Sequence, residues 1–140
     1  TKGKEEEAIT RLARVGFDNV LGFLDGGYGN WVKSSGKIKK IKSISAEKFV
    51  NEIRASKKNI YDVRSMEEFK IGHFPGAKNT PLKNIDKHIP ELKKNSPFYI
   101  YCKAGYRSVV ASSFINRVND LKLINVKGGY DSIEKLIFST

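Results

Sequence analysis

The chain has 140 residues, 39% of them hydrophobic and 29% charged, which suits one domain of ordinary globular composition. Its single cysteine excludes an internal disulfide and a multi-cysteine metal cluster, and no apolar run approaches the ~18 residues of a membrane span. The net charge is +11, but the basic runs contain no nucleic-acid-binding motif and no interleaved aromatic residues. The charge therefore favours attraction of small anions over nucleic-acid binding. A lone thiol without a signal-peptide pattern predicts a cytoplasmic protein.

The first forty residues predict a helix, a strand and a second helix. Apolar residues at helical spacing, with glutamates in the first turn, predict a helix over 4–15 that ends at Gly16. A strand over 19–24, a turn at Asp25-Gly26-Gly27 and a helix over 28–33 follow. The lysine-rich residues 36–43 have no sustained core pattern, and we expect a linker there.

The rest of the chain alternates short apolar strands with helices. Strands are expected over 59–63, 78–81, 98–102 and 123–126, and helices over 46–55, 65–71, 106–118 and 130–138. Residues 72–77 predict a loop, and residues 82–92 a helical region broken at Pro90. This alternation predicts an α/β fold with a central parallel sheet and helices on both faces. Active residues of such sheets lie beyond the carboxyl ends of the strands, where Asp62 and Cys102 both fall.

The stretch around Cys102 has the composition of an active loop. An apolar strand ends at the cysteine, and a predicted helix begins four residues later. Gly105 permits a tight turn, and the helix start together with Arg107 favours the thiolate form of the thiol. A buried cysteine can also serve only as a small apolar residue, and Arg107 can serve only as a surface residue at a helix start. The setting favours a nucleophile.

A shift of 102 positions aligns the N-terminal region with the C-terminal one. Gly26-Gly27-Tyr28 falls on Gly128-Gly129-Tyr130, and Gly3 on Gly105. Glu5 falls on Arg107, and the counterpart of Cys102 would precede Thr1. Residues 1–36 are therefore interpreted as the C-terminal remnant of a preceding, degenerate copy of the domain that occupies residues 37–140. Chance similarity between two helix–strand–turn–helix units is the alternative.

Three motifs in order resemble the rhodanese (sulfurtransferase) family: Asp62-Val63-Arg64-Ser65-Met66-Glu67-Glu68-Phe69, Gly72-His73-Phe74-Pro75-Gly76-Ala77-Lys78-Asn79 and Cys102-Lys103-Ala104-Gly105-Tyr106-Arg107-Ser108. The late Gly128-Gly129 turn is similar to the family's final Gly-Gly turn. The resemblance covers residues 44–138. It implies a rhodanese-like fold without a metal or cofactor.

The resemblance also implies the chemistry. Cys102 would take a sulfane sulfur from thiosulfate or a low-molecular-weight persulfide and pass it to a thiol or to cyanide. The substrate-binding loop would comprise Lys103, Ala104, Gly105, Tyr106, Arg107 and Ser108. Its N–H groups would hold the anion, and Arg107 would contact it. Asp62 and Arg64 would support the loop, with Arg64 free to pair with Glu67 or Glu68. His73 is interpreted as a hydrogen-bonded loop residue rather than a base.

Two other functions remain open from the sequence. Cysteine-dependent phosphatases use Cys-x5-Arg, and the Cys-x4-Arg spacing here argues against that chemistry. A non-catalytic rhodanese module that binds partners or regulates an attached enzyme is the alternative from another class. Tandem rhodanese domains resembling this one occur fused to metallo-β-lactamase-type hydrolase domains, which implies an attached hydrolase in a longer protein. The remnant at 1–36 would expose apolar surface and favour a homodimer.

Overall fold

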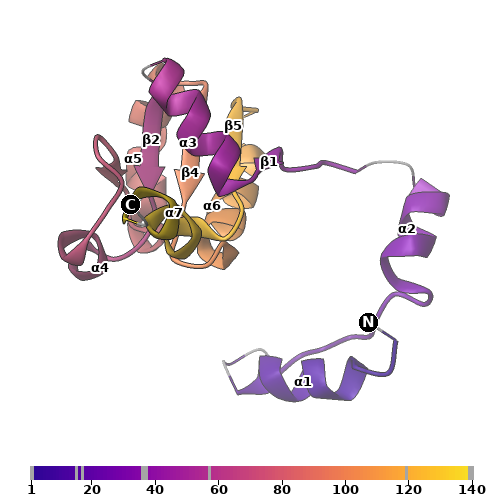
Figure 1. The fold of residues 1–140 in the computed structure, drawn as a ribbon. Helices are drawn as coiled ribbons and strands as arrows, with labels where there is room; N and C mark the ends of the chain where they lie inside the picture. The colour runs from indigo at the N-terminus through magenta and orange to yellow at the C-terminus, as the bar shows by residue number, and fades with distance from the viewer. Residues whose placement is uncertain are drawn as a thin grey trace. The chain divides into compact units, whose positions relative to one another are not determined.

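The computed structural model describes residues 2–14, 16, 18–35, 38–56, 58–118 and 120–138. The chain divides into two compact units, Thr1–Lys40 and Ile41–Thr140, which are described separately (Figure 1). Val15, Gly36 and Lys37, which belong to the predicted first helix and linker, lie outside the described residues. None of the described helices combines the length and apolar character that crossing a bilayer requires.

The larger unit is built on a five-stranded sheet in which every strand pair is parallel. The strands are β1 Ser43–Ile44, β2 Asn59–Asp62, β3 Lys78–Asn79, β4 Phe98–Tyr101 and β5 Leu123–Val126, in the order β1-β5-β4-β2-β3. The four strands predicted in this unit are thereby confirmed. The sequence missed β1. Its first residue, Ser43, ends the predicted linker and pairs with Asn125, and Ile44 pairs with Val126.

Helices cover both faces of this sheet, which confirms the predicted α/β fold class. Helices α3 Ala46–Ala55 and α7 Gly129–Phe138 share one apolar core with the sheet, built around Phe49, Tyr99 and Ile133. Helices α5 Ile85–Lys94 and α6 Tyr106–Val118 share the other core, around Leu92, Ile100 and Ile115. Figure 1 shows α3 and α7 in front of the sheet and α5 and α6 behind it. The sheet is therefore buried between two helical layers.

The helical region around Pro90 differs from the prediction. A short 3₁₀ turn, η1 Leu82–Asn84, precedes α5, and α5 continues through Pro90 instead of breaking there. Proline removes one backbone hydrogen bond from a helix, but most helical stability comes from packing an apolar face. Here Ile85 and Leu92 are buried on either side of Pro90, so packing holds the helix together.

The smaller unit contains two helices, α1 Glu5–Ala13 and α2 Gly27–Ser35, as the sequence predicts. The strand predicted over 19–24 is wrong, because residues 18–24 pair with no strand among the described residues. A strand needs a hydrogen-bonded neighbour, and this unit offers none in its described part. Leu21 is consequently 94% exposed, whereas Leu123, which lies 102 positions later, is 5% exposed within β5.

The two units share the backbone geometry of their glycine turns. Gly26 and Gly27 have φ angles of 67° and 56°, and Gly128 and Gly129 have 74° and 58°. Helices α2 and α7 begin at the second glycine of each pair, 102 positions apart in the chain. These left-handed conformations favour glycine, which explains why the same Gly-Gly pair stands at both places.

Candidate functional site

The parallel register brings the ends of three strands together. Asp62 at the end of β2 pairs with Tyr101 at the end of β4 and with Asn79 at the end of β3. Cys102 follows β4 directly, and the next three residues connect it to the start of α6. The Val63 N–H donates to the Tyr101 carbonyl at 2.9 Å, which holds the two strand ends level. The sequence expectation that Asp62 and Cys102 share one edge is confirmed.

The loop wraps closely around the cysteine sulfur. The Gly105 N–H donates to Cys102 Sγ at 3.2 Å, and Gly105 has a φ of +103°, a left-handed conformation that favours glycine. The buried Ser108 hydroxyl donates to the Gly105 carbonyl at 3.0 Å. Cys102 itself is only 1% exposed. The loop therefore offers the sulfur a backbone N–H and leaves little of it open to solvent.

Helix α7 supports the loop through N–H groups at its N-terminus. The Tyr130 N–H donates to the Cys102 carbonyl at 2.7 Å, and the Asp131 N–H donates to the Lys103 carbonyl at 3.1 Å. The approach is so close that a Cβ added at Gly129 would lie 2.2 Å from the Cys102 carbonyl oxygen. With these carbonyls turned towards α7, the loop can direct an N–H towards the sulfur.

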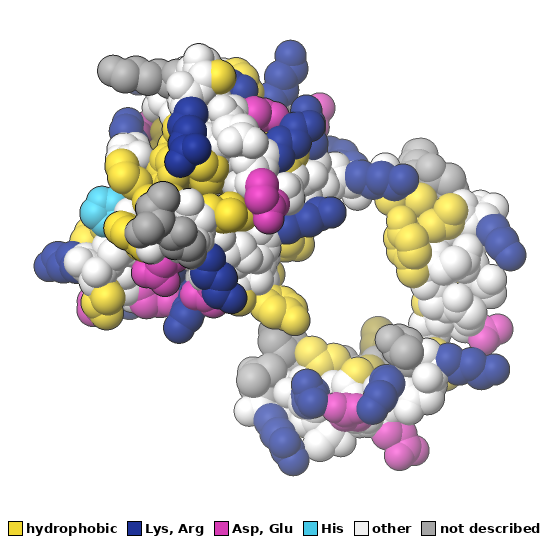
Figure 2. All heavy atoms as spheres, in the orientation of Figure 1, with side chains coloured by type: hydrophobic (Ala, Val, Ile, Leu, Met, Phe, Trp, Pro, Cys, Tyr) yellow, Lys and Arg dark blue, Asp and Glu magenta, His cyan; other side chains and the backbone are white. Residues whose placement is uncertain are grey.

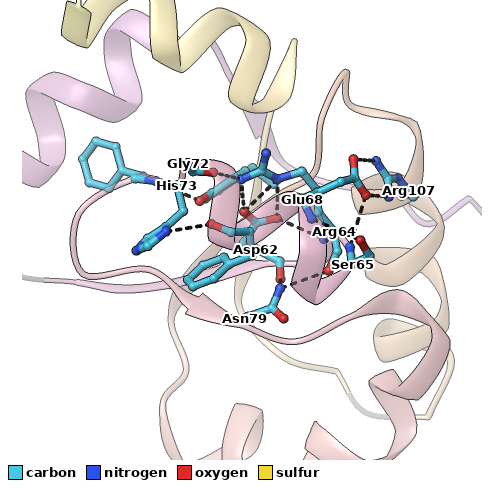
Figure 3. A network of polar contacts seen from close by, with 11 residues as sticks. Asp62, Arg64, Ser65, Glu68, Gly72, His73, Asn79 and Arg107 are labelled. Atoms are coloured by element: carbon cyan, nitrogen blue, oxygen red, sulfur yellow. Dashed lines mark hydrogen bonds and ion pairs between the residues drawn. The ribbon is translucent and has the colours of Figure 1, made fainter.

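Arg107 is held by a carboxylate from another helix, α4 Met66–Ile71 (Figure 3). Its Nη1 and Nη2 atoms lie 2.5 and 2.7 Å from the two carboxylate oxygens of Glu68. Glu68 also accepts the Ser65 N–H at 3.2 Å, and Ser65 Oγ accepts the Glu68 N–H at 3.2 Å, which completes the predicted capping box. The hydrogen bonds from Arg107 lower the pKa of Glu68 to about 2, against partial burial.

Arg64 forms a separate buried pair with Asp62. Its Nε atom lies 2.9 Å and its Nη2 atom 2.6 Å from Asp62 Oδ2, and Nη2 also donates to the Gly72 carbonyl at 2.6 Å. Burial opposes the charge of Arg64, but the hydrogen bonds with Asp62 raise its pKa overall. The structure thus pairs Arg64 with Asp62, and not with Glu67 or Glu68 as the sequence allowed. Asn79 Nδ2 donates to the Asp62 and Arg64 carbonyls and fixes the same strand end.

The remaining predicted residues lie at the surface of the loop. Lys103, Ala104 and Tyr106 are exposed, Tyr106 by 83%.

His73 stacks on Phe69 and its Nδ1 lies 2.9 Å from the Phe69 carbonyl, as expected of a loop residue held by a hydrogen bond. In the described part of the chain, no three His, Cys, Asp or Glu side chains gather as a metal site requires. Figure 2 shows Lys and Arg side chains scattered over the face in view.

Sequence reasoning missed two contributors to this site. The capping-box pattern identified Glu68 as a helix cap, but its contact with Arg107, 39 positions along the chain, has no local signal. The contact between α7 and the loop carbonyls was equally hidden, although the Gly-Gly pair marked a place of close backbone approach. Both contacts come from elements that only the tertiary fold brings beside Cys102.

Known proteins with the same architecture include several that match in sequence. Residues 45–136 match the family model of the rhodanese-like domain. The putative sulfur carrier protein YrkF of Bacillus subtilis is 36% identical over 97 residues, which are 69% of this chain and 52% of that protein. The adenylyltransferase and sulfurtransferase UBA4 of Meyerozyma guilliermondii is 33% identical over 87 residues, 56% of this chain and 20% of that protein.

Solved structures agree with these sequence matches. The crystal structure of a rhodanese-like domain protein from Staphylococcus aureus is 33% identical, covers 66% of this chain and 91% of that chain, and gives a TM-score of 0.62. This chain spans about half the length of YrkF and a fifth of UBA4, so those proteins contain parts that have no counterpart here.

Proposed function

Because the chain belongs to the rhodanese-like domain family, we propose that it is a sulfurtransferase in which Cys102 carries the sulfur. Relatives named as a sulfur carrier and a sulfurtransferase support transfer of sulfur in general. The single observation that supports Cys102 as the carrier is its place in the loop: its Sγ accepts the Gly105 N–H at the carboxyl edge of the sheet. Two hydrogen bonds from α7 hold the loop in this arrangement.

The proposed reaction has two steps. In the first, the Cys102 thiolate attacks the sulfane sulfur of the donor, a new S–S bond forms, and the donor's S–S bond breaks. The electron pair of the broken bond leaves with sulfite when thiosulfate is the donor, or with the thiolate RS⁻ when RS–S⁻ is the donor. In the second step, a thiolate or cyanide attacks the outer sulfur of the Cys102 persulfide and regenerates the Cys102 thiolate. Neither step needs an oxidant or a cofactor.

The residues around the sulfur have clear tasks in this scheme. The Gly105 N–H stabilises negative charge on Sγ and then on the persulfide. Ser108 holds the Gly105 carbonyl, so it keeps that N–H in place. Asp62 and Arg64 fix the neighbouring strand end and the 72–77 loop, and they do not take part in bond making.

Intact-mass spectrometry tests the proposal. Wild-type protein incubated with thiosulfate or glutathione persulfide should gain one sulfur atom, and cyanide should remove it. The Cys102→Ser variant should gain none, while Ser113→Ala, an exposed serine of α6, should behave as wild type. Absence of the adduct from wild type with a broad panel of donors would contradict the proposal.

A binding module without catalysis is the second candidate, and one observation favours it. Cys102 is 1% exposed and Arg107 is already engaged by Glu68, so neither group is open to a large substrate. The rate of alkylation by iodoacetamide separates the two functions. A sulfurtransferase should react as a thiolate near neutral pH, whereas a binding module should react only as the pH approaches ~8.5, the ordinary range for a thiol.

We also propose that residues 1–36 are the end of a preceding rhodanese-like domain. The matching glycine φ angles and helix starts of the two units support this interpretation. In the larger unit, β5 lies between β1 and β4, and the exposed residues 21–24 correspond to β5. The natural gene should therefore encode a strand and a rhodanese-type loop upstream of Thr1, and their absence there would refute the assignment.

A further inference from the structure

The binding loop contains two cations, Lys103 and Arg107, and the structure treats them differently. Lys103 is exposed at the surface, whereas Arg107 meets the Glu68 carboxylate with two hydrogen bonds of 2.5 and 2.7 Å. A bidentate pair of this kind satisfies the planar guanidinium fork and cancels its charge. The loop thus presents less positive charge to a substrate than its sequence implies.

We infer that Glu68 is a specificity-determining residue, which cancels the charge of Arg107 and makes the site prefer a singly charged organic persulfide to dianionic thiosulfate. This inference rests on the proposed sulfur transfer through Cys102. Glu68 does not touch the reacting atoms; it acts through Arg107.

The geometry of the pair supports this role in two ways. Glu68 is fixed on its own helix, because its side chain and N–H complete the capping box with Ser65 (Figure 3). A Glu68 side chain that moved aside would lose the hydrogen bond from the Ser65 N–H as well as those from Arg107, which favours the paired arrangement. Arg107 also interacts electrostatically with the cysteine. The pKa of Arg107 is raised chiefly by the hydrogen bonds with Glu68 and, in addition, by negative charge at Cys102. Without Glu68, the positive charge of Arg107 would therefore attract an anion bound at Cys102.

The chemistry of the two donors then separates them. Thiosulfate brings two negative charges to the loop, and its leaving group, sulfite, keeps both. An organic persulfide RS–S⁻ brings one, and its leaving thiolate carries one. With Arg107 neutralised, Lys103 and the loop N–H groups must balance the incoming charge. One negative charge is matched by these groups, whereas a second is not.

The test compares Glu68→Gln with wild type and with a matched control. Glutamine at this position can still accept the Ser65 N–H, so the capping box is retained while the charge on Arg107 is released. Glu67→Gln removes a neighbouring exposed carboxylate of the same helical turn and serves as the control. For each protein, the second-order rate constant of Cys102 persulfide formation is measured with thiosulfate and with cysteine persulfide, whose ammonium and carboxylate charges cancel and leave one net negative charge. Circular dichroism checks that each variant is folded.

We expect Glu68→Gln to raise this rate constant for thiosulfate about tenfold, the size of one added charge-assisted contact, with less than a twofold change for cysteine persulfide. Glu67→Gln should change neither value beyond twofold. A loss with both donors in Glu68→Gln, or an equal change with both, would overturn the inference and leave Glu68 as a structural residue.

A second readout keeps this inference separate from the proposed reaction. Sulfate is a dianion that cannot donate sulfur, so its protection of Cys102 against iodoacetamide reports anion binding alone. Glu68→Gln should strengthen this protection about tenfold relative to wild type and Glu67→Gln. If no protein gains sulfur from either donor, the proposed function fails while the sulfate result still decides the role of Glu68. Unchanged protection would overturn that role.

Discussion

Replacing Gly129 with alanine should disrupt the active loop more than any other single-methyl change at a glycine turn. An added Cβ would lie 2.2 Å from the Cys102 carbonyl oxygen and 2.4 Å from the Lys103 carbonyl oxygen, and both are backbone atoms that no rotamer change can move. The loop must therefore shift away from α7. That shift breaks the hydrogen bonds that Tyr130 and Asp131 donate to these carbonyls at 2.7 and 3.1 Å.

The expected cost follows from these contacts. Alanine at the φ of +58° costs about 1–2 kcal/mol, and the two lost hydrogen bonds cost about 1 kcal/mol each. We therefore expect Gly129→Ala to lower the free energy of unfolding by about 3–4 kcal/mol. Gly76→Ala is the matched control, since Gly76 has a φ of +80° and no atom within 4 Å of an added Cβ. It should lose only the conformational part, about 1–2 kcal/mol.

Urea unfolding followed by far-ultraviolet circular dichroism measures the difference. Tryptophan fluorescence is unsuitable, because the only tryptophan, Trp31, lies in the smaller unit. Persulfide formation should also slow in Gly129→Ala and stay near the wild-type rate in Gly76→Ala. Equal losses of stability in the two variants would refute the idea that α7 holds the loop through this close approach.

Three further changes test other contacts. Asp62→Asn should lower the free energy of unfolding in urea by about 3–5 kcal/mol, because it leaves the buried Arg64 guanidinium without its anion. Glu7→Gln, which removes one carboxylate of an exposed ion pair, should lower it by less than about 0.5 kcal/mol. Similar losses in the two variants would contradict this reasoning. The pKa of Glu68 falls from 4.5 to about 2 on folding, so its pair stabilises by about 1–2 kcal/mol above pH ~4.5 and loses this as pH drops towards 2. If the free energy of unfolding of wild type exceeded that of Glu68→Gln by the same amount at pH 2 as at neutral pH, this contribution of the ion pair would be refuted. Ser45→Ala should lower stability by about 1 kcal/mol, because the Ser45 side chain caps α3, and an unchanged urea midpoint would argue against the cap.

Most of the fold could be predicted from local patterns. The helix over 46–55 has a serine cap and apolar residues on one face, and α3 has these same bounds. The predictions that failed depended on distant neighbours. Residues 19–24 have the composition of a strand but pair with no strand among the described residues. Pro90 disfavours a helix, but burial of Ile85 and Leu92 keeps α5 continuous through it. Local propensity does not report either condition.

The site could be predicted in its position but not in its electrostatics. The spacing of Cys102, Gly105 and Arg107 identified the loop, and the structure places all three around the sulfur and the start of α6. The partner of Arg107 could not be foreseen, because Glu68 reaches it from a helix 39 positions earlier. The presence of an arginine in a binding loop thus indicates its location, while its effective charge depends on the carboxylate that the fold places beside it.

The proposed repeat would match Gly3 and Glu5 of the smaller unit with Gly105 and Arg107. The Gly3 N–H donates to Glu5 Oε1 at 3.1 Å. The matching Gly105 N–H in the larger unit donates to Cys102 Sγ at 3.2 Å. The Glu5 carboxylate therefore accepts the N–H that a bound anion would need, and its negative charge would repel that anion. If residues 1–36 do end a second domain, that copy should bind sulfate more weakly than the Cys102 loop, and Glu5→Gln should narrow the difference.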